Sequence, residues 1–300
     1  IAEAALSAVQ KSYISGGSIT TTGNVNVYSW QNKDLASPGA HATLGGNGGS
    51  ADISLVEAAV NRAAAKSEAV NYAYISGVNI GSAADRAGAL AVESAGNSIA
   101  RADLAEALLS AGLASIGLNT LYATASGDFQ AYIDTTGAAI YAASVLVDNT
   151  YTSQAQAETT QSIGGVKVNV AGVTGNIATA IVDTGARAAI QGNGTINTTG
   201  TIKVNAAGIA DSLAGVMTPS GTLSYIDIAA NILTATLAAN QKAYIENVKI
   251  ENAGDVTVTS TLNKSAEHGA IAKLGSSAGS LGAEISYYGG TASSAIAVFE

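Results

Sequence analysis

The side chains that could carry acid–base or metal chemistry are few and lie far apart in the chain. The two histidines are His41, in a turn-like segment, and His268, in a polar stretch. Neither has a second histidine or a carboxylate at ligand spacing, so both are expected to be surface side chains. Cysteine is absent, which excludes disulfides, thiolate nucleophiles and cysteine-based zinc sites. This inventory argues against most classes of enzyme.

Carboxylates are the remaining candidates, because solenoid glycosidases and polysaccharide lyases need clustered carboxylates, a base or a calcium site. The sequence has no Asp-x-Asp motif, and its aspartates stand singly, as at Asp148, Asp183, Asp211 and Asp227. The glycine-rich LGGNGG (44–49) lacks the lysine of a phosphate-binding loop and is expected to be a surface turn. We therefore predict no catalytic, cofactor-binding or metal-binding residue. Carboxylates that meet on neighbouring coils stay open as the alternative.

The composition indicates a folded chain of small side chains. Among 300 residues 34 are glycine, aromatic residues make up 5%, charged residues 12% and hydrophobic residues 47%. The mean hydropathy is +0.27, which argues against disorder. The net charge of −9 argues against binding to nucleic acid or to an anionic membrane. Polar residues interrupt every apolar run before 18 residues, so we expect no transmembrane segment.

A repeat of about 57 residues organises the chain. Its anchor is a Tyr-Ile pair or an equivalent, at residues 13, 74, 132, 189 and 244, with spacings of 61, 58, 57 and 55. The fullest matches are Gln10-Lys11-Ser12-Tyr13-Ile14 and Gln241-Lys242-Ala243-Tyr244-Ile245. We therefore treat residues 1–300 as one β-solenoid segment of about five repeats of 55–61 residues.

After each anchor the sequence alternates between apolar and polar residues around a turn. The turns are Gly23-Asn24, Gly200-Thr201 and Gly254-Asp255. The apolar pairs that follow or correspond to them are Val25/Val27, Val145/Val147, Ile202/Val204 and Val256/Val258. The second repeat matches worst, since it keeps Val78 and Ile80 and then loses the pattern. Alternation of β-branched residues between turn residues is the signal of β-strands.

These features predict an all-β fold, a right-handed parallel β-helix with a narrow core of small apolar residues. With two or three coils in each repeat, the chain would make on the order of 10 to 15 coils and a rod ~50 to 70 Å long. Glycine and asparagine would form the corners between faces. The open ends would expose strand edges, which favours end-to-end self-association.

Two alanine-rich segments, 54–73 and 98–114, leave a choice between helix and strand. Both are rich in helix formers, and Leu104, Leu108 and Ala111 would share one helical face. The alternative is that alanine is small enough for the strands of a solenoid. The fold prediction therefore includes short helical insertions as an option.

The recurring tyrosines and the threonine-rich patches also have two interpretations. Tyr13, Tyr74, Tyr132 and Tyr244 either form an exposed binding ladder or stack between coils, and their recurrence with the coil favours stacking. The threonines at 20–22 and 257–261 suggest an ice-binding face, but they do not keep one register through the repeats.

The phrases around the last anchor resemble one family, the leukotoxin-type filamentous adhesins that include the fusobacterial leukotoxin. The most similar stretch runs from Lys242-Ala243-Tyr244-Ile245 to Gly254-Asp255-Val256-Thr257-Val258-Thr259. The segment 164–190 is similar to the coil that precedes this anchor in the family. The resemblance extends through nearly all 300 residues and is weakest over 76–128.

Membership of this family would imply a very large exported protein with a β-helical body. We therefore expect a fragment of a bacterial virulence protein, secreted or on the cell surface, that contacts a protein or glycan receptor on host cells, especially leukocytes. The expected mechanism is multivalent contact along a rigid rod, without enzymatic activity and without a cofactor. The alternatives are a segment of a polysaccharide-degrading solenoid and a structural or ice-binding solenoid.

Overall fold

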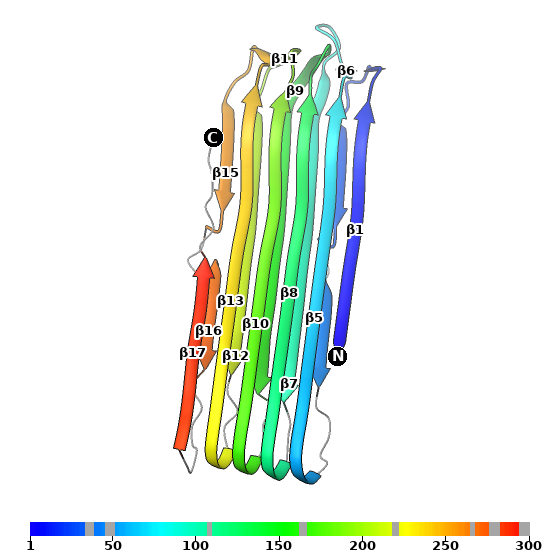
Figure 1. Cartoon of the computed structure of the whole chain (residues 1–300). Helices are drawn as coiled ribbons and strands as arrows, with labels where there is room; N and C mark the ends of the chain where they lie inside the picture. Colours follow the sequence, from blue (N-terminus) through cyan, green and yellow to red (C-terminus); the bar gives the residue numbers. More distant parts are fainter. Residues whose placement is uncertain are drawn as a thin grey trace.

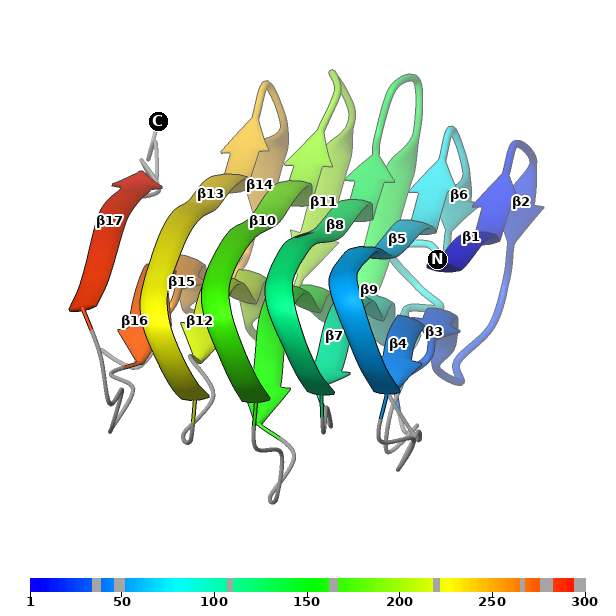
Figure 2. The ribbon, with the colours of Figure 1, turned by 60° about the horizontal axis from the view of Figure 1, so that its bottom comes forward.

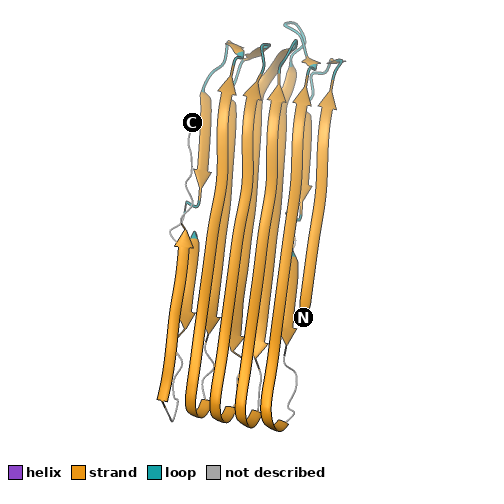
Figure 3. Cartoon of the chain, viewed as in Figure 1, coloured by secondary structure: helices purple, strands orange, loops and turns teal. Residues whose placement is uncertain are grey.

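The computed structural model of the chain describes residues 1–33, 39–45, 52–106, 110–161, 167–217, 222–264, 268–275 and 283–293. Every regular element in this part of the chain is a β-strand, and every pairing between strands is parallel (Figure 3). The all-β prediction is confirmed, and the arrangement is that of a β-solenoid.

The strands form two sheets that pack face to face (Figures 1 and 2). Sheet A contains β1 (Ala2–Ser15), β5 (Asp52–Ser76), β8 (Ser110–Asp134), β10 (Lys167–Gln191), β13 (Thr222–Glu246) and β17 (Ala283–Ser293), in that order. Sheet B contains β2 (Ser18–Ile19), β3 (Val25–Gln31), β4 (Ala40–Gly45), β6 (Asn79–Ile80), β7 (Ala87–Glu106), β9 (Ala139–Gln161), β11 (Thr195–Thr198), β12 (Ile202–Met217), β14 (Lys249–Glu251), β15 (Val256–Leu262) and β16 (Ala270–Gly275).

Each sequence repeat makes one coil, so the expected two or three coils per repeat is wrong. A coil runs up one long strand of sheet A, turns, and returns through sheet B (Figure 1). The anchors at residues 13, 74, 132, 189 and 244 lie side by side on neighbouring strands. Six strands in sheet A stack to only about 25 Å, whereas a strand of 25 residues is about 80 Å long. The predicted 10 to 15 coils and ~50 to 70 Å length are therefore wrong as well.

The predicted number of coils is wrong because the strands are much longer than expected. In β8 and β10 small residues such as alanine occupy most of the inward positions, while the outward positions hold both polar and apolar residues, and the strand continues as long as small residues fit the narrow core. Residues 54–73 lie within β5, and the described parts of 98–114 lie within β7 and β8. The helical option is therefore wrong there, because pairing with neighbouring coils outweighs the helix propensity of alanine. Leu108 lies outside the described residues.

The core between the sheets is narrow and built from in-register rows of small apolar side chains. One cluster is dominated by alanine, including the row Ala42, Ala102, Ala157, Ala214 and Ala272. The other cluster contains isoleucine and valine and lies close to the turns that follow the long strands. The predicted composition of the inner face is confirmed.

A row of asparagines crosses sheet A inside the core. Asn61, Asn119, Asn176 and Asn231 are in register on four neighbouring strands. Each Nδ2 donates to the Oδ1 of the next asparagine, at 3.0 Å from Asn61, 2.8 Å from Asn119 and 2.7 Å from Asn176. Identical polar groups thus satisfy one another from coil to coil, which fixes the register of the strands.

The corners between the sheets use residues that tolerate positive φ, as expected. Gly16, Gly77, Gly137 and Gly192 have φ between 61° and 113°, and Asn247 has φ 57°. The second repeat keeps the common pattern after a longer corner, because Leu90 and Val92 are in register with Val25 and Val27. Its poor match in sequence reflects inserted residues rather than a lost coil.

Candidate functional site

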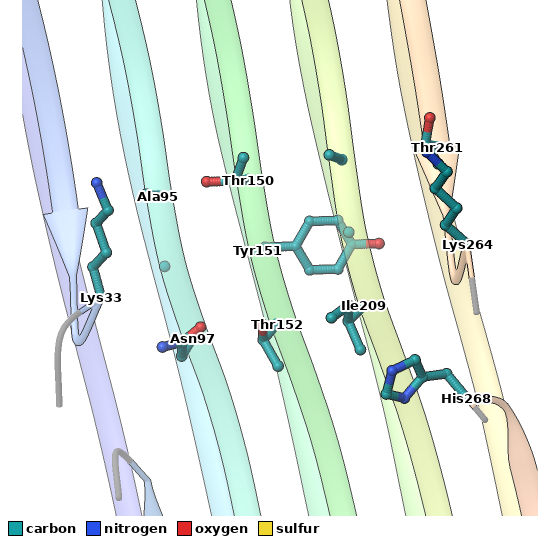
Figure 4. Close-up of a pocket in the computed structure, with 13 residues that line it drawn as sticks. Lys33, Ala95, Asn97, Thr150, Tyr151, Thr152, Ile209, Thr261, Lys264 and His268 are labelled. Carbon is teal, nitrogen blue, oxygen red and sulfur yellow. The ribbon is translucent and has the colours of Figure 1, made fainter. Parts of the chain in front are cut away.

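In the described part of the chain, a trough crosses the outer face of sheet B, with a cavity volume of about 440 Å³ (Figure 4). Its floor consists of small side chains and backbone from β7, β9 and β12, including Ala95, Thr150 and Ala207. Asn97, Thr152 and Ile209 form the next outward row. The trough lies across the strands, so a long ligand would contact several coils at once.

The trough is bounded where the outermost strands of sheet B break. The three central strands continue past this level, but β3 and β15 end just before Asn32 and Asn263, which have φ of 53° and 48°. The chain then turns away and places Lys33 at one end of the trough and Lys264 with His268 at the other (Figure 4). These two ends lie about 20 Å apart, on the outermost of five neighbouring strands. Lysine and histidine are the only ionisable groups besides Tyr151 among the described residues that line the trough.

Beneath the floor of the trough, the inward-facing row of sheet B alternates between glycine and an aromatic residue. Tyr151 lies between Gly96 and Gly208 in register and is 4% exposed. Its ring stacks on Phe129 of sheet A at 5.3 Å between centroids. A Cβ on either glycine would overlap one of these rings, so both positions require glycine. Burial raises the pKa of the Tyr151 hydroxyl, which has no hydrogen-bond partner among the residues that the structure describes.

Beside the trough the structure brings together carboxylates that are far apart in sequence. Glu93 and Asp148 are in register on β7 and β9, and Asn205 donates to Asp148 Oδ1 at 2.7 Å. Burial and the Asp148 charge raise the pKa of Glu93, while Lys33 opposes this shift. Asp103 and Glu158 form a second pair, and burial followed by the Glu158 charge raises the pKa of Asp103. No short motif marks either pair, and both correspond to the open alternative of carboxylates that meet on neighbouring coils.

The tyrosine anchors lie on the outer face of sheet A. The Tyr13 and Tyr74 rings stack at 5.0 Å, and the Tyr74 and Tyr132 rings at 4.9 Å, nearly parallel in both cases. The next anchor in the row after Tyr132 is Ala189, which has no ring to stack. The guanidinium of Arg187 lies over the Tyr132 ring instead, at 4.7 Å from the ring centroid. The stacking interpretation is confirmed for the first three anchors. The facing sides of these rings cover one another, whereas Tyr13, at the edge of the sheet, is still 58% exposed.

The other residues singled out from the sequence lie apart from one another. His41 is exposed on β4, whereas His268 is partly buried, with its Nδ1 3.8 Å from Asp211 Oδ2. Asp183 is exposed on β10. The side chain of Asp227 and most of the glycine-rich segment 44–49 lie outside the described residues. Thr179 and Thr234 are neighbours on sheet A, but isoleucine in adjacent rows prevents a regular threonine grid there.

Within the described residues, no group of three or more potential metal ligands occurs. The same part of the chain has no helix long and apolar enough to cross a membrane. No family model, curated protein or solved structure matches the sequence. The function must therefore be inferred from the two outer faces of the solenoid.

Proposed function

We propose that this chain is a segment of a large exported bacterial β-solenoid that binds molecules on host cells, leukocytes in particular, through the outer face of sheet B. The coil would be right-handed, as nearly all parallel crossover connections are. The location would be extracellular or on the bacterial surface. The trough is the observation that carries the proposal.

Three properties of the trough support a binding role. It crosses several strands, so one extended ligand would gain contacts from several coils. Its floor offers alanine methyl groups, threonine hydroxyls and the Asn97 amide, a mixture that suits a glycan or a peptide. Lys33 and Lys264 at its two ends suit a ligand with anionic groups about 20 Å apart.

The test is binding of the purified chain to human leukocytes, with erythrocytes and epithelial cells as comparison, measured by flow cytometry with viability counts. Ala207→Arg fills the floor of the trough, and we expect it to weaken binding at least about tenfold, or ~1.4 kcal/mol. Ala238→Arg is the matched control, since Ala238 is exposed on the outer face of sheet A. Absence of binding by the folded chain, or equal binding by both variants, would contradict the proposal.

The Glu93–Asp148 pair supports a second candidate, hydrolysis of a polysaccharide. Neighbouring carboxylates with one raised pKa resemble the acid and nucleophile of a retaining glycosidase, which lie about 5 Å apart. Release of reducing ends from neutral and acidic polysaccharides would test this activity. We expect Glu93→Gln to abolish it and Glu68→Gln, on the opposite sheet, to leave it unchanged. No release from any substrate would leave binding as the only function.

A further inference from the structure

The outer face of sheet A carries an unpartnered apolar patch near the start of the long strands. Its members are large aliphatic side chains with exposed fractions between 40% and 74%: Val60, Ile116, Leu118, Val173, Ile228 and Ile232. They come from four neighbouring strands, β5, β8, β10 and β13. We call this set the aliphatic patch.

The strand register makes the aliphatic patch continuous. Ile116, Val173 and Ile228 form one row across three strands, and Val60 and Leu118 form part of the next row. Ile232 lies one further row along, next to the partly buried Ile177. Three rows on four strands cover about 400 Å², which is large for one contiguous apolar patch on a monomer.

The charges near the patch lie at one margin. On the four strands of the patch, the ionisable residue in these three rows is Arg62 of β5, whose Nη1 lies 3.4 Å from Oε1 of Glu3 on β1. Lys66, two rows further on, pairs with Glu68 at 2.5 Å. An apolar centre with paired charges at the rim is the composition of a protein–protein interface.

The strands of the sheet that carries the patch have little twist relative to one another, although each strand bends along its length (Figure 2). The stacked rings of Tyr13, Tyr74 and Tyr132 deviate from parallel by only 5° and 2° across three strands, so these strands have little twist relative to one another. Flat sheets of several strands are unusual unless they are stabilised by ladders or by stacking on another sheet. Equal spacing of strands and rows makes such a surface complementary to a copy of itself.

We propose that the aliphatic patch is a dimer interface, at which a second copy of this chain packs sheet A against sheet A about a two-fold axis. With the two following rows, which contain Ala64 and Ile181 and reach Lys66 at the β5 margin, the contact covers about 600 Å² on each copy. The total of about 1,200 Å² reaches the lower limit of specific interfaces. The paired copies would direct their sheet B troughs to opposite sides, so one dimer would present two binding faces.

The test uses the full chain in sedimentation equilibrium over a wide concentration range. We expect a reversible dimer and expect Leu118→Lys, in the middle row of the aliphatic patch, to weaken it at least about tenfold. Leu118 is 40% exposed, so the substitution is compatible with folding. Val9→Lys is the matched control, because Val9 is 68% exposed on the same face outside the patch. Far-UV circular dichroism checks both variants.

Crosslinking gives a second readout. The chain has no cysteine, so Ile177→Cys introduces a single thiol, and Ile177 lies in the middle row of the five-row contact, where a residue meets its own copy near a two-fold axis. We expect oxidation to give a covalent dimer with Ile177→Cys and not with Val9→Cys. A monomer at all concentrations, or a dimer that Leu118→Lys leaves intact, would overturn the proposal. Both outcomes are independent of leukocyte binding, so each proposal can fail alone.

Discussion

The buried asparagine row should contribute measurably to stability, and Asn176→Ala tests this. Asn176 is 7% exposed, accepts from Asn119 Nδ2 at 2.8 Å and donates to Asn231 Oδ1 at 2.7 Å. Its loss removes two hydrogen bonds of about 1 kcal/mol each and leaves the Asn231 Oδ1 acceptor without this donor, for about 1 kcal/mol or more. We expect the free energy of unfolding to fall by about 3 kcal/mol.

Urea denaturation followed by circular dichroism measures this loss. With an m-value of about 3 kcal/mol/M or more for a chain of this size, the midpoint should fall by about 1 M or less. The control is Asn240→Ala, because Asn240 is exposed on the outer face of the same sheet, and its change should stay below about 0.5 kcal/mol. If Asn176→Ala and Asn240→Ala cost the same, the asparagine row does not stabilise the stack and the reasoning is refuted.

Three further outcomes are expected. Gly208→Ala would force a methyl group into the Tyr151 ring and should destabilise the chain by about 1–3 kcal/mol in thermal unfolding, whereas Gly117→Ala, with nothing within 4 Å of its new Cβ, should not. Burial and a carboxylate hydrogen bond raise the pKa of Tyr72 to about 12, so its contribution to stability is complete below pH 10 and is lost between pH 10 and 12. In Tyr72→Phe, the free energy of unfolding should therefore fall less between pH 10 and 12 than in the unchanged chain. Burial also raises the pKa of Asp103, so its ionised form is disfavoured by folding; Asp103→Asn should raise stability at pH 7 and lose this advantage near pH 3, as urea titrations at both pH values would reveal.

The repeat and the strands were predictable from sequence because they depend on local patterns. The anchors recur at nearly constant spacing, and the structure places them in one row. Coil size was not predictable in the same way. Strand length depends on whether alternation continues through residues as small as alanine, glycine and serine, and their weak hydrophobic contrast hides that continuity.

The trough and the carboxylate pairs depend on register between coils, which no short motif encodes. Glu93 and Asp148 are 55 residues apart and become neighbours only once each repeat is known to form one coil. The asparagine row did leave a signal, because Asn61, Asn119, Asn176 and Asn231 follow the same spacings of 58, 57 and 55 as the tyrosine anchors. Aligning the repeats on polar as well as apolar residues would have found it.

The one-coil repeat also determines how the molecule would respond to mechanical load. Tyr132 and its in-register partner Ala189 are 57 residues apart along the chain, yet their strands are only about 4.8 Å apart in the stack. Peeling one coil from an end would thus release about 200 Å of extended chain. Force along the strands would instead load the backbone hydrogen bonds of a whole strand together. The solenoid should therefore resist shear along the strands strongly, whereas under peeling it should unfold one coil at a time and dissipate the applied work in steps.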